Sequence, residues 1–322
     1  MARPSLPADR RWALLAVVVS LGACGGVAEL ERPAYPQAPR GDQVDDYHGT
    51  RVADPYRWLE QLDSTRTRDW VDAQNAVSEA YLVDLPARAS FAERMATLID
   101  YERVGLPDEQ GGVHVFDYND GRMEQEVVRV SSDPTDLGRV VLDPNAMADD
   151  GSISIGDYEL SPDGRYLAYS LSFGGSDWDS WRVMDLRNDR DLADRIEGTK
   201  FTGVAWLPDG SGFYYSRYPQ VDDDFDDSQQ VEVHVHRLGQ DQSRDQLVYA
   251  VDDHPTRNPY ADVTEDGRLL IIDLFDGYET NGVYVQRLDE QGLPTGDVQR
   301  LLDDWDARYD FLGNVDDTLY FQ

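Results

Sequence analysis

Short runs of alternating apolar and polar residues, separated by turn residues, follow one another from about residue 101 to the end of the chain. The segment VHVFDYNDGRMEQEVVRVSS predicts two strands joined across Asn119, Asp120 and Gly121, because these residue types accept the positive φ angles of a tight turn. The same design returns in YELSPDGRYLAYSLSF, VAWLPDGSGFYYSRYP, YADVTEDGRLLIIDLF and, more weakly, YDFLGNVDDTLYFQ. This part of the chain is therefore predicted to be a series of repeats of one β-unit.

The repeat unit is an apolar strand, a turn that contains Asp-Gly, and a strand of alternating aromatic and aliphatic residues. The Asp-Gly pairs begin at Asp163, Asp209 and Asp266, which are 46 and 57 residues apart, and the acidic insertion VDDDFDDSQQ lengthens the second interval. A period in the forties, with about four strands, is typical of a β-propeller blade, whose sheet buries its faces only against neighbouring blades. The predicted fold class is mainly β, with a β-propeller over residues 101–322.

The segment that precedes the repeats carries apolar residues at three- and four-residue steps, which predicts helices. Asp54 and Pro55 predict a helix start, because Asp caps free backbone N–H groups and Pro fits a first helical position. A second helix is predicted to start at Ser64 or Thr65 and to be broken at Pro86. A third short helix, SFAERMATLIDYE, has an apolar stripe along one side, formed by Phe91, Met95 and Leu98.

The N-terminus has the features of an export signal. Arg10 and Arg11 precede an apolar run that ends at Leu21 and is too short to span a bilayer as a permanent helix. Residues 1–23 are therefore predicted to be a signal peptide. The sequence LGACG at its end resembles the bacterial lipobox, in which the peptide is cleaved before the cysteine, here Cys24, and the thiol is diacylated.

Cys24 is the only cysteine of the chain, so no intramolecular disulfide can form, and lipidation gives the unpaired thiol a purpose. A chance cysteine behind an ordinary signal peptide is the alternative. Residues 24–40 are rich in Gly, Pro and Ala, which predicts a flexible tether between an acyl anchor and the folded protein. We therefore expect an exported lipoprotein, periplasmic or anchored to the outer membrane, that contacts the membrane only through its lipid.

Acidic residues exceed basic residues by 63 to 29, which gives the chain a formal net charge of −34. Such a charge repels nucleic acids and anionic membrane surfaces, so a DNA- or RNA-binding function is excluded. The bias fits a salt-loving source and an acidic protein from an ordinary organism equally well. Composition alone does not distinguish the two.

Residues 46–75, DYHGTRVADPYRWLEQLDSTRTRDWVDAQN, resemble the N-terminal signature of prolyl oligopeptidases, and the resemblance continues through residues 140–186 and 200–219. This family joins a seven-bladed β-propeller to an α/β-hydrolase domain that carries a Ser-Asp-His triad. The resemblance implies that residues 41–100 are a helical segment of the peptidase domain and that residues 101–322 form about four to five blades. It therefore implies an incomplete propeller and an α/β-hydrolase domain outside this chain.

The resemblance also implies a function, that of a serine endopeptidase that hydrolyses short proline-containing peptides while the propeller restricts access. Such an enzyme is expected to be a monomer at full length. Because the triad follows the propeller in this family, no catalytic residue, cofactor site or metal site is expected in this chain, and the segment alone is expected to be inactive. Two alternatives stay open: an enzyme like oligopeptidase B, which cuts after Arg or Lys, and a non-catalytic lipid-anchored propeller that binds or scaffolds a partner.

Some polar residues resemble site chemistry but are expected to serve the fold. Ser176 follows two glycines, but no helix is predicted after it, as a nucleophile elbow requires. His234 and His236 share one face of a predicted strand, where a metal would need a further ligand, and packing within a blade is expected instead. His254, beside two aspartates, is expected in a turn. The acidic run 222–227 lacks the glycine and glutamate of an EF-hand loop.

Overall fold

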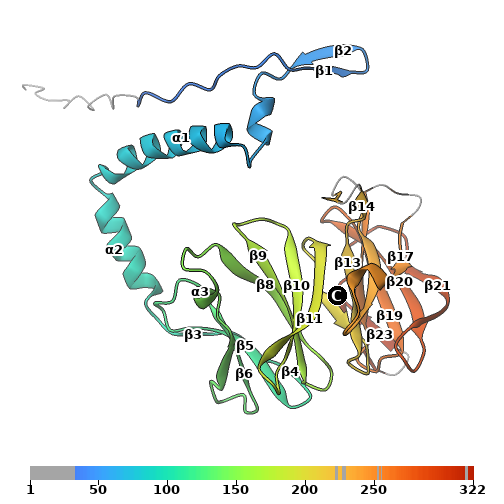
Figure 1. Ribbon diagram of the computed structural model, residues 1–322. Coiled ribbons are helices and arrows are strands. Elements are labelled where there is room, and N and C mark those ends of the chain that lie inside the picture. The colour runs from blue at the N-terminus through green and yellow to red at the C-terminus, as the bar shows by residue number, and fades with distance from the viewer. Residues whose placement is uncertain (1–32, 222–223, 227–229, 252–253, 255, 316–317) are drawn as a thin grey trace, which may run out of the picture. The chain divides into compact units, whose positions relative to one another are not determined.

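Two compact units, residues 1–95 and 96–322, make up the chain. The computed structural model describes residues 33–221, 224–226, 230–251, 254, 256–315 and 318–322 (Figure 1). The predicted signal peptide, Cys24 and part of the predicted tether lie outside the described residues. Within the described ranges, no helix is both long enough and apolar enough to cross a bilayer.

The first unit contains a short hairpin followed by helices. Its elements are β1 (Val44–Tyr47), β2 (Thr50–Ala53), the 3-10 helix η1 (Arg57–Glu60), α1 (Thr65–Val83) and most of α2 (Arg88–Ile99). Helix α1 begins where the sequence predicts, because the Ser64 hydroxyl accepts the Thr67 N–H at 3.1 Å and caps the helix. The two helices are separated by a break around Pro86, also as predicted.

The helix predicted to begin at Pro55 is not formed, and this prediction was wrong. The Asp54 carboxylate accepts the Tyr56 N–H at 3.2 Å, as the predicted cap requires, and pairs with Arg57 Nε at 2.7 Å, but no α-helix continues from it. Only the single 3-10 turn η1 follows.

Four antiparallel sheets follow one another in the second unit (Figure 1). The first contains β3 (Arg103–Val104), β4 (Asp108–Gln110), β5 (Val113–Asn119), β6 (Val127–Ser131) and β7 (Arg139–Leu142). The second contains β8 (Ile153–Leu160), β9 (Tyr166–Phe173), β10 (Asp179–Asp185) and β11 (Arg190–Thr199). The third contains β12 (Val204–Trp206), β13 (Gly212–Arg217), β16 (Glu232–Arg237) and β17 (Gln246–Tyr249), and the fourth contains β18 (Arg257–Val263), β19 (Leu269–Asp276), β20 (Thr280–Leu288) and β21 (Pro294–Leu302).

Shorter elements lie between and after these sheets. They are α3 (Pro144–Met147), β14 (Gln220–Val221), β15 (Asp224–Phe225), the 3-10 helix η2 (Gln242–Arg244), β22 (Phe311–Val315) and β23 (Thr318–Phe321). Strands β22 and β23 pair as one more hairpin after the fourth sheet. Each four-stranded sheet follows the chain as a meander, which is the blade of a propeller, so the predicted mainly β fold is confirmed.

The Asp-Gly turns connect the first two strands of a blade, as the repeats predict. In the second blade, the Ser161 hydroxyl donates to Asp163 Oδ1 at 2.8 Å and accepts the Tyr166 N–H at 2.9 Å. In the fourth blade, Thr264 makes the same two bonds, at 2.9 and 3.0 Å, with the equivalent residues. The repeated hydroxyl-x-Asp-Gly sequence therefore holds the turn to the strand that follows it.

The hydrophobic core lies between blades rather than within one sheet. One buried cluster joins the first and second blades, including Val115, Val128, Leu142, Leu160 and Leu167. Another joins the second and third, including Trp181, Ile196, Trp206 and Phe213, and another joins the third and fourth, including Leu207, Tyr214, Leu270 and Ile272. Each sheet therefore depends on its neighbours for the burial of its faces.

Candidate functional site

The inner strands of the blades line a cavity of about 990 Å³, which we call the central cavity. Strands β8, β12 and β18 form most of its wall, and the end of β4 completes it. Its carboxylate residues come from the first, second and fourth blades and are Glu109, Asp157, Glu159, Asp262, Glu265, Asp266 and Asp273. No basic side chain lines the cavity within the described part of the chain.

Strand alternation places these carboxylates on the cavity side. In β8, Tyr158 and Leu160 pack into the core between the first two blades, so Asp157 and Glu159 point the other way. In β18, the neighbours of Asp262 on each side pack between the third and fourth blades, and Asp262 itself lines the cavity. The inner strands thus present apolar residues to the core and acidic residues to the cavity.

Burial raises the pKa of four of the cavity carboxyl groups, which are Asp157, Glu159, Asp262 and Asp273, whereas at Asp266 burial is outweighed by bonds to Arg268 and Thr264, which lower the pKa. Burial, followed by the charges of Asp108, Asp157 and Asp262, raises the pKa of Glu159 to about 8. Burial, followed by the charge of Asp262, raises the pKa of Asp273 to about 7. The cavity wall therefore becomes more negatively charged as the pH rises through neutrality.

A second hollow, of about 620 Å³, lies beside the loops that follow β9 and β13, and we call it the rim pocket. Trp178 lies in its wall, in edge contact with Tyr218 at a centroid distance of 5.5 Å and 6.3 Å from the Phe225 ring. The Lys200 ammonium lies 4.1 Å from the Trp178 ring centroid, within the range of a cation–π contact. Loops of the second and third blades therefore build an aromatic surface.

Comparison with known proteins identifies the family. A family model described as the N-terminal β-propeller domain of prolyl oligopeptidase matches residues 36–322, which is most of the chain. The chain belongs to the prolyl oligopeptidase family. The resemblance seen in residues 46–75 and in the blade repeats is thereby confirmed.

Relatives within the prolyl oligopeptidase family are longer than this chain. The prolyl endopeptidase of Elizabethkingia meningoseptica is 31% identical over 289 residues, which cover 89% of this chain and 40% of the relative. Prolyl oligopeptidase A of Galerina marginata is 31% identical over 323 residues, which cover 89% of this chain and 44% of the relative. A structure of prolyl oligopeptidase B from Galerina marginata, bound to a 35mer hydrolysis and macrocyclization substrate, matches with a TM-score of 0.73 and 28% identity, covering 90% and 44%. The chain thus spans about two fifths of their length.

Ser176 lies in the loop between β9 and β10, as the sequence predicts. Its hydroxyl accepts the Trp178 N–H at 3.0 Å, and its carbonyl oxygen accepts a hydrogen bond from the Ser172 hydroxyl at 2.5 Å. Strand β10, rather than a helix, follows the loop, so the strand–turn–helix geometry of a nucleophile elbow is not formed at Ser176.

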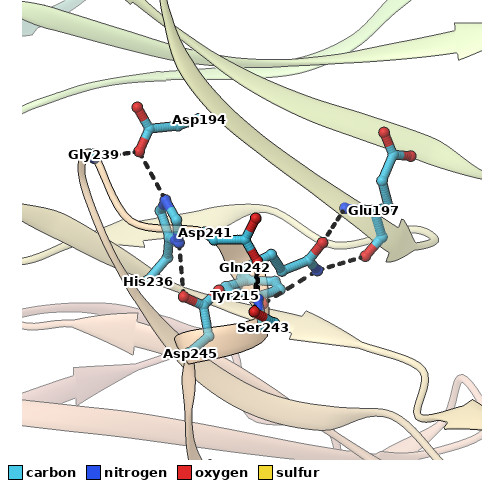
Figure 2. Close-up of polar contacts among 9 residues, drawn as sticks. All are labelled: Asp194, Glu197, Tyr215, His236, Gly239, Asp241, Gln242, Ser243 and Asp245. Carbon is cyan, nitrogen blue, oxygen red and sulfur yellow. Dashed lines mark hydrogen bonds and ion pairs between the residues drawn. The ribbon is translucent and has the colours of Figure 1, made fainter.

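His234 and His236 lie on one face of β16, opposite Tyr215 and Phe213 of β13. His234 Nε2 lies 3.1 Å from a Glu232 oxygen, and both ring nitrogens of His236 contact carboxylates (Figure 2). His234 therefore pairs with a carboxylate of its own blade, and His236 pairs with one carboxylate of the third blade and one of the second. The described residues contain no group of three or more His, Cys, Asp or Glu arranged to hold a metal ion.

Other residues that the sequence singled out are described only in part. His254 is exposed, but the two aspartates before it lie outside the described residues, so a base–orienter pair there is not tested. Three aspartates of the acidic run 222–227 also lie outside the described residues. The part of the run that is described forms β15 and the residue after it.

The cavity carboxylates were not singled out from the sequence. The signal that was available is an acidic residue at every second position of a strand that precedes an Asp-Gly turn, as in Asp157 and Glu159 before Ser161. In a four-stranded blade the first strand is the innermost, so side chains of this strand that are not buried against a neighbouring blade lie beside the central channel. The alternation of acidic and apolar residues along a strand, combined with the position of that strand in its blade, therefore predicts which carboxylates line the central cavity.

Replacing Glu159 with glutamine should stabilise the protein by up to about 4 kcal/mol at about pH 8 and by less than about 1 kcal/mol at about pH 5. A carboxyl group whose pKa is raised by folding keeps its proton where the unfolded chain has lost it, so stability falls as the pH rises towards the folded pKa. Thermal melts of both proteins at the two pH values measure this. Glu290→Gln, in an exposed turn, is the control, and its effect on stability should be the same at both pH values.

Proposed function

We propose that the chain is the N-terminal, propeller-containing portion of a serine endopeptidase that hydrolyses short proline-containing peptides. The support is the family match over residues 36–322 together with relatives described as prolyl endopeptidases. The catalytic Ser-Asp-His residues would then belong to a hydrolase domain outside this chain. The hairpin environment of Ser176 agrees with this assignment.

The propeller's part in this function would be to restrict which substrates reach the catalytic domain. The central cavity, about 990 Å³, is in the size range of sites that enclose small ligands and short peptide segments, and a folded protein does not fit in it. Its wall of carboxylates lacks basic partners among the described lining residues, so it also disfavours acidic peptides. Access would thus depend on both size and charge.

The helical segment would supply the contact with the hydrolase domain. On α2, the side chains of Phe91, Met95 and Leu98 are 68%, 62% and 54% exposed, although they form the apolar stripe that the sequence predicts. An exposed apolar stripe of this kind marks an interaction surface. We propose that the hydrolase domain covers it in the complete enzyme.

The function is tested with the complete gene product and with this chain, each assayed on a proline-amide reporter and on an arginine-amide reporter. We expect the complete protein to cleave the proline reporter and the chain alone to cleave neither. Cleavage of only the arginine reporter would favour an enzyme like oligopeptidase B, and no cleavage by the complete protein would favour a scaffold. Turnover by the chain alone would contradict the assignment of the triad to another domain.

We further propose that the protein is an exported lipoprotein, anchored through Cys24, the first residue after the predicted signal peptide. The support is the sequence LGACG after a short apolar run. Cys24→Ser should abolish incorporation of labelled palmitate and move the protein from the membrane fraction to the soluble fraction. Ser20→Ala, a change nearby that leaves the cysteine, should do neither. Labelling that persists in Cys24→Ser would refute the lipidation site.

A further inference from the structure

His236 lies between two carboxylates that come from different parts of the propeller. Its Nδ1 is 2.8 Å from Asp245 Oδ1, and its Nε2 is 3.0 Å from Asp194 Oδ1 (Figure 2). Asp194 belongs to β11, the last strand of the second blade, whereas His236 and Asp245 belong to the third blade. The side chains of all three residues are at most 2% exposed, so water does not screen the contacts.

The hydrogen bonds around His236 define its charge. A neutral imidazole has one N–H donor and one acceptor nitrogen, whereas the imidazolium ion has two donors. Both carboxylates already serve as acceptors, since Asp194 accepts the Gly239 N–H at 2.6 Å and Asp245 accepts the Tyr215 hydroxyl at 2.8 Å. Two accepting carboxylates, one on each nitrogen, match a ring that carries two protons.

The electrostatics of the site agree with this geometry. Burial by itself lowers the pKa of His236, but the hydrogen bonds to Asp194 and Asp245 and the charges of both carboxylates outweigh burial and raise the pKa to about 9. Burial raises the pKa of Asp194, yet its bonds to His236 and Gly239 leave it below the usual value. The other titratable groups nearby are Asp241 on the η2 loop, Tyr215 on β13 and His234 on β16.

We propose that His236 is positively charged at neutral pH and that this charge holds the second blade against the third, as a pH-sensitive joint of the propeller. Loss of the proton leaves a nitrogen lone pair against one of the carboxylates, which weakens the bond across the blades. Beside this joint, the Gln242 amide brackets the Glu197 backbone, accepting its N–H at 3.1 Å and donating to its oxygen at 2.9 Å (Figure 2). These neutral bonds do not titrate, so the joint should loosen rather than separate.

The joint has a consequence for the rim pocket, because Glu197 and Gly198 at the end of β11 form part of the pocket wall. A weaker joint should therefore increase opening motions of β11 above all. Folding raises the pKa of His236 above its value of about 6.5 in an unfolded chain. Its contribution is therefore fully present below about pH 6.5 and is lost as the pH rises towards about 9.

The charge state is tested directly by nitrogen NMR of the full chain labelled with ¹⁵N-histidine, since the two ring nitrogens of an imidazolium differ in shift from those of either neutral tautomer. We expect both His236 nitrogens to be protonated at about pH 7.5, with a titration well above that of a free histidine. The His236 signals are assigned by their absence in His236→Gln. A single neutral tautomer at about pH 7.5 would overturn the proposal. If His236→Gln does not fold, the hydrogen exchange of the unchanged protein still tests the proposal.

The joint itself is tested by hydrogen exchange of the β11 amides, corrected for the intrinsic effect of pH. Protection of β11 should fall by at least about tenfold between pH 7 and pH 9.5 in the unchanged protein, because each unit of the His236 pKa shift corresponds to a factor of ten in the stability of the joint. In His236→Gln it should be low at both pH values. His234→Gln, a buried histidine two residues away with one carboxylate partner, is the control and should keep the pH dependence. Equal protection of β11 at both pH values in the unchanged protein would overturn the proposal.

Discussion

Replacing Trp206 with alanine should destabilise the propeller by about 3–5 kcal/mol, the usual cost of removing a large buried aromatic side chain. Trp206 is 6% exposed and lies on β12, the inner strand of the third blade. Its ring stacks on Tyr166 of the second blade at a centroid distance of 6.3 Å and meets Phe213 edge to face at 5.4 Å. Its Nε1 donates to the Glu159 carbonyl oxygen at 3.1 Å. One side chain thus joins two blades and the central cavity wall.

The matched variant Trp206→Phe keeps an aromatic ring at this position and removes the bond to Glu159. It should cost about 1–2 kcal/mol, because the carbonyl oxygen loses its donor and part of the ring volume is lost. Urea unfolding followed by circular dichroism measures both variants against the unchanged protein. If Trp206→Ala loses no more than Trp206→Phe, the aromatic contact between blades is not a major source of stability.

The sequence predicts the structural features that depend on contacts between nearby residues and on the repeat of apolar positions along a strand or helix. The Asp-Gly turns recur because Ser161 and Thr264 make the same pair of hydrogen bonds in their blades, and such turns are visible as a motif. The cap of α1 is equally local, since Ser64 binds a backbone N–H three residues away. Together with the alternation in the strands, these features are enough to predict blades from the order of residues alone.

Features that depend on contacts between blades are not visible in this way. His236 pairs with Asp194 across 42 residues, and from the sequence it is one of two histidines on a strand. The carboxylates of the central cavity come from three blades and meet only when the blades are arranged around an axis. Near Pro55, Asp54 makes the expected capping bond to a backbone N–H, yet only a single 3-10 turn follows. Structural features that the residue pattern alone does not determine therefore depend on contacts that only the folded structure shows.

Replacing Gly111 with alanine should destabilise the propeller by about 2–5 kcal/mol, through backbone strain and overpacking together. Gly111 has a φ of +59°, in the left-handed region that favours glycine. A Cβ atom there would lie 2.3 Å from the Asp163 carbonyl carbon, so the β4–β5 turn of the first blade packs backbone to backbone against the Asp-Gly turn of the second. Neither backbone can move without separating the inner ends of the two blades.

The neighbouring glycine provides the control for this prediction. Gly112 also has a positive φ, +80°, but a Cβ atom there would meet nothing within 4 Å. Gly112→Ala should therefore cost only the strain of the left-handed conformation, about 1–2 kcal/mol. The difference between the two variants in urea unfolding isolates the contact between the blades. Equal losses would mean that the two turns do not touch in solution, and the central cavity would then be open between its first two blades.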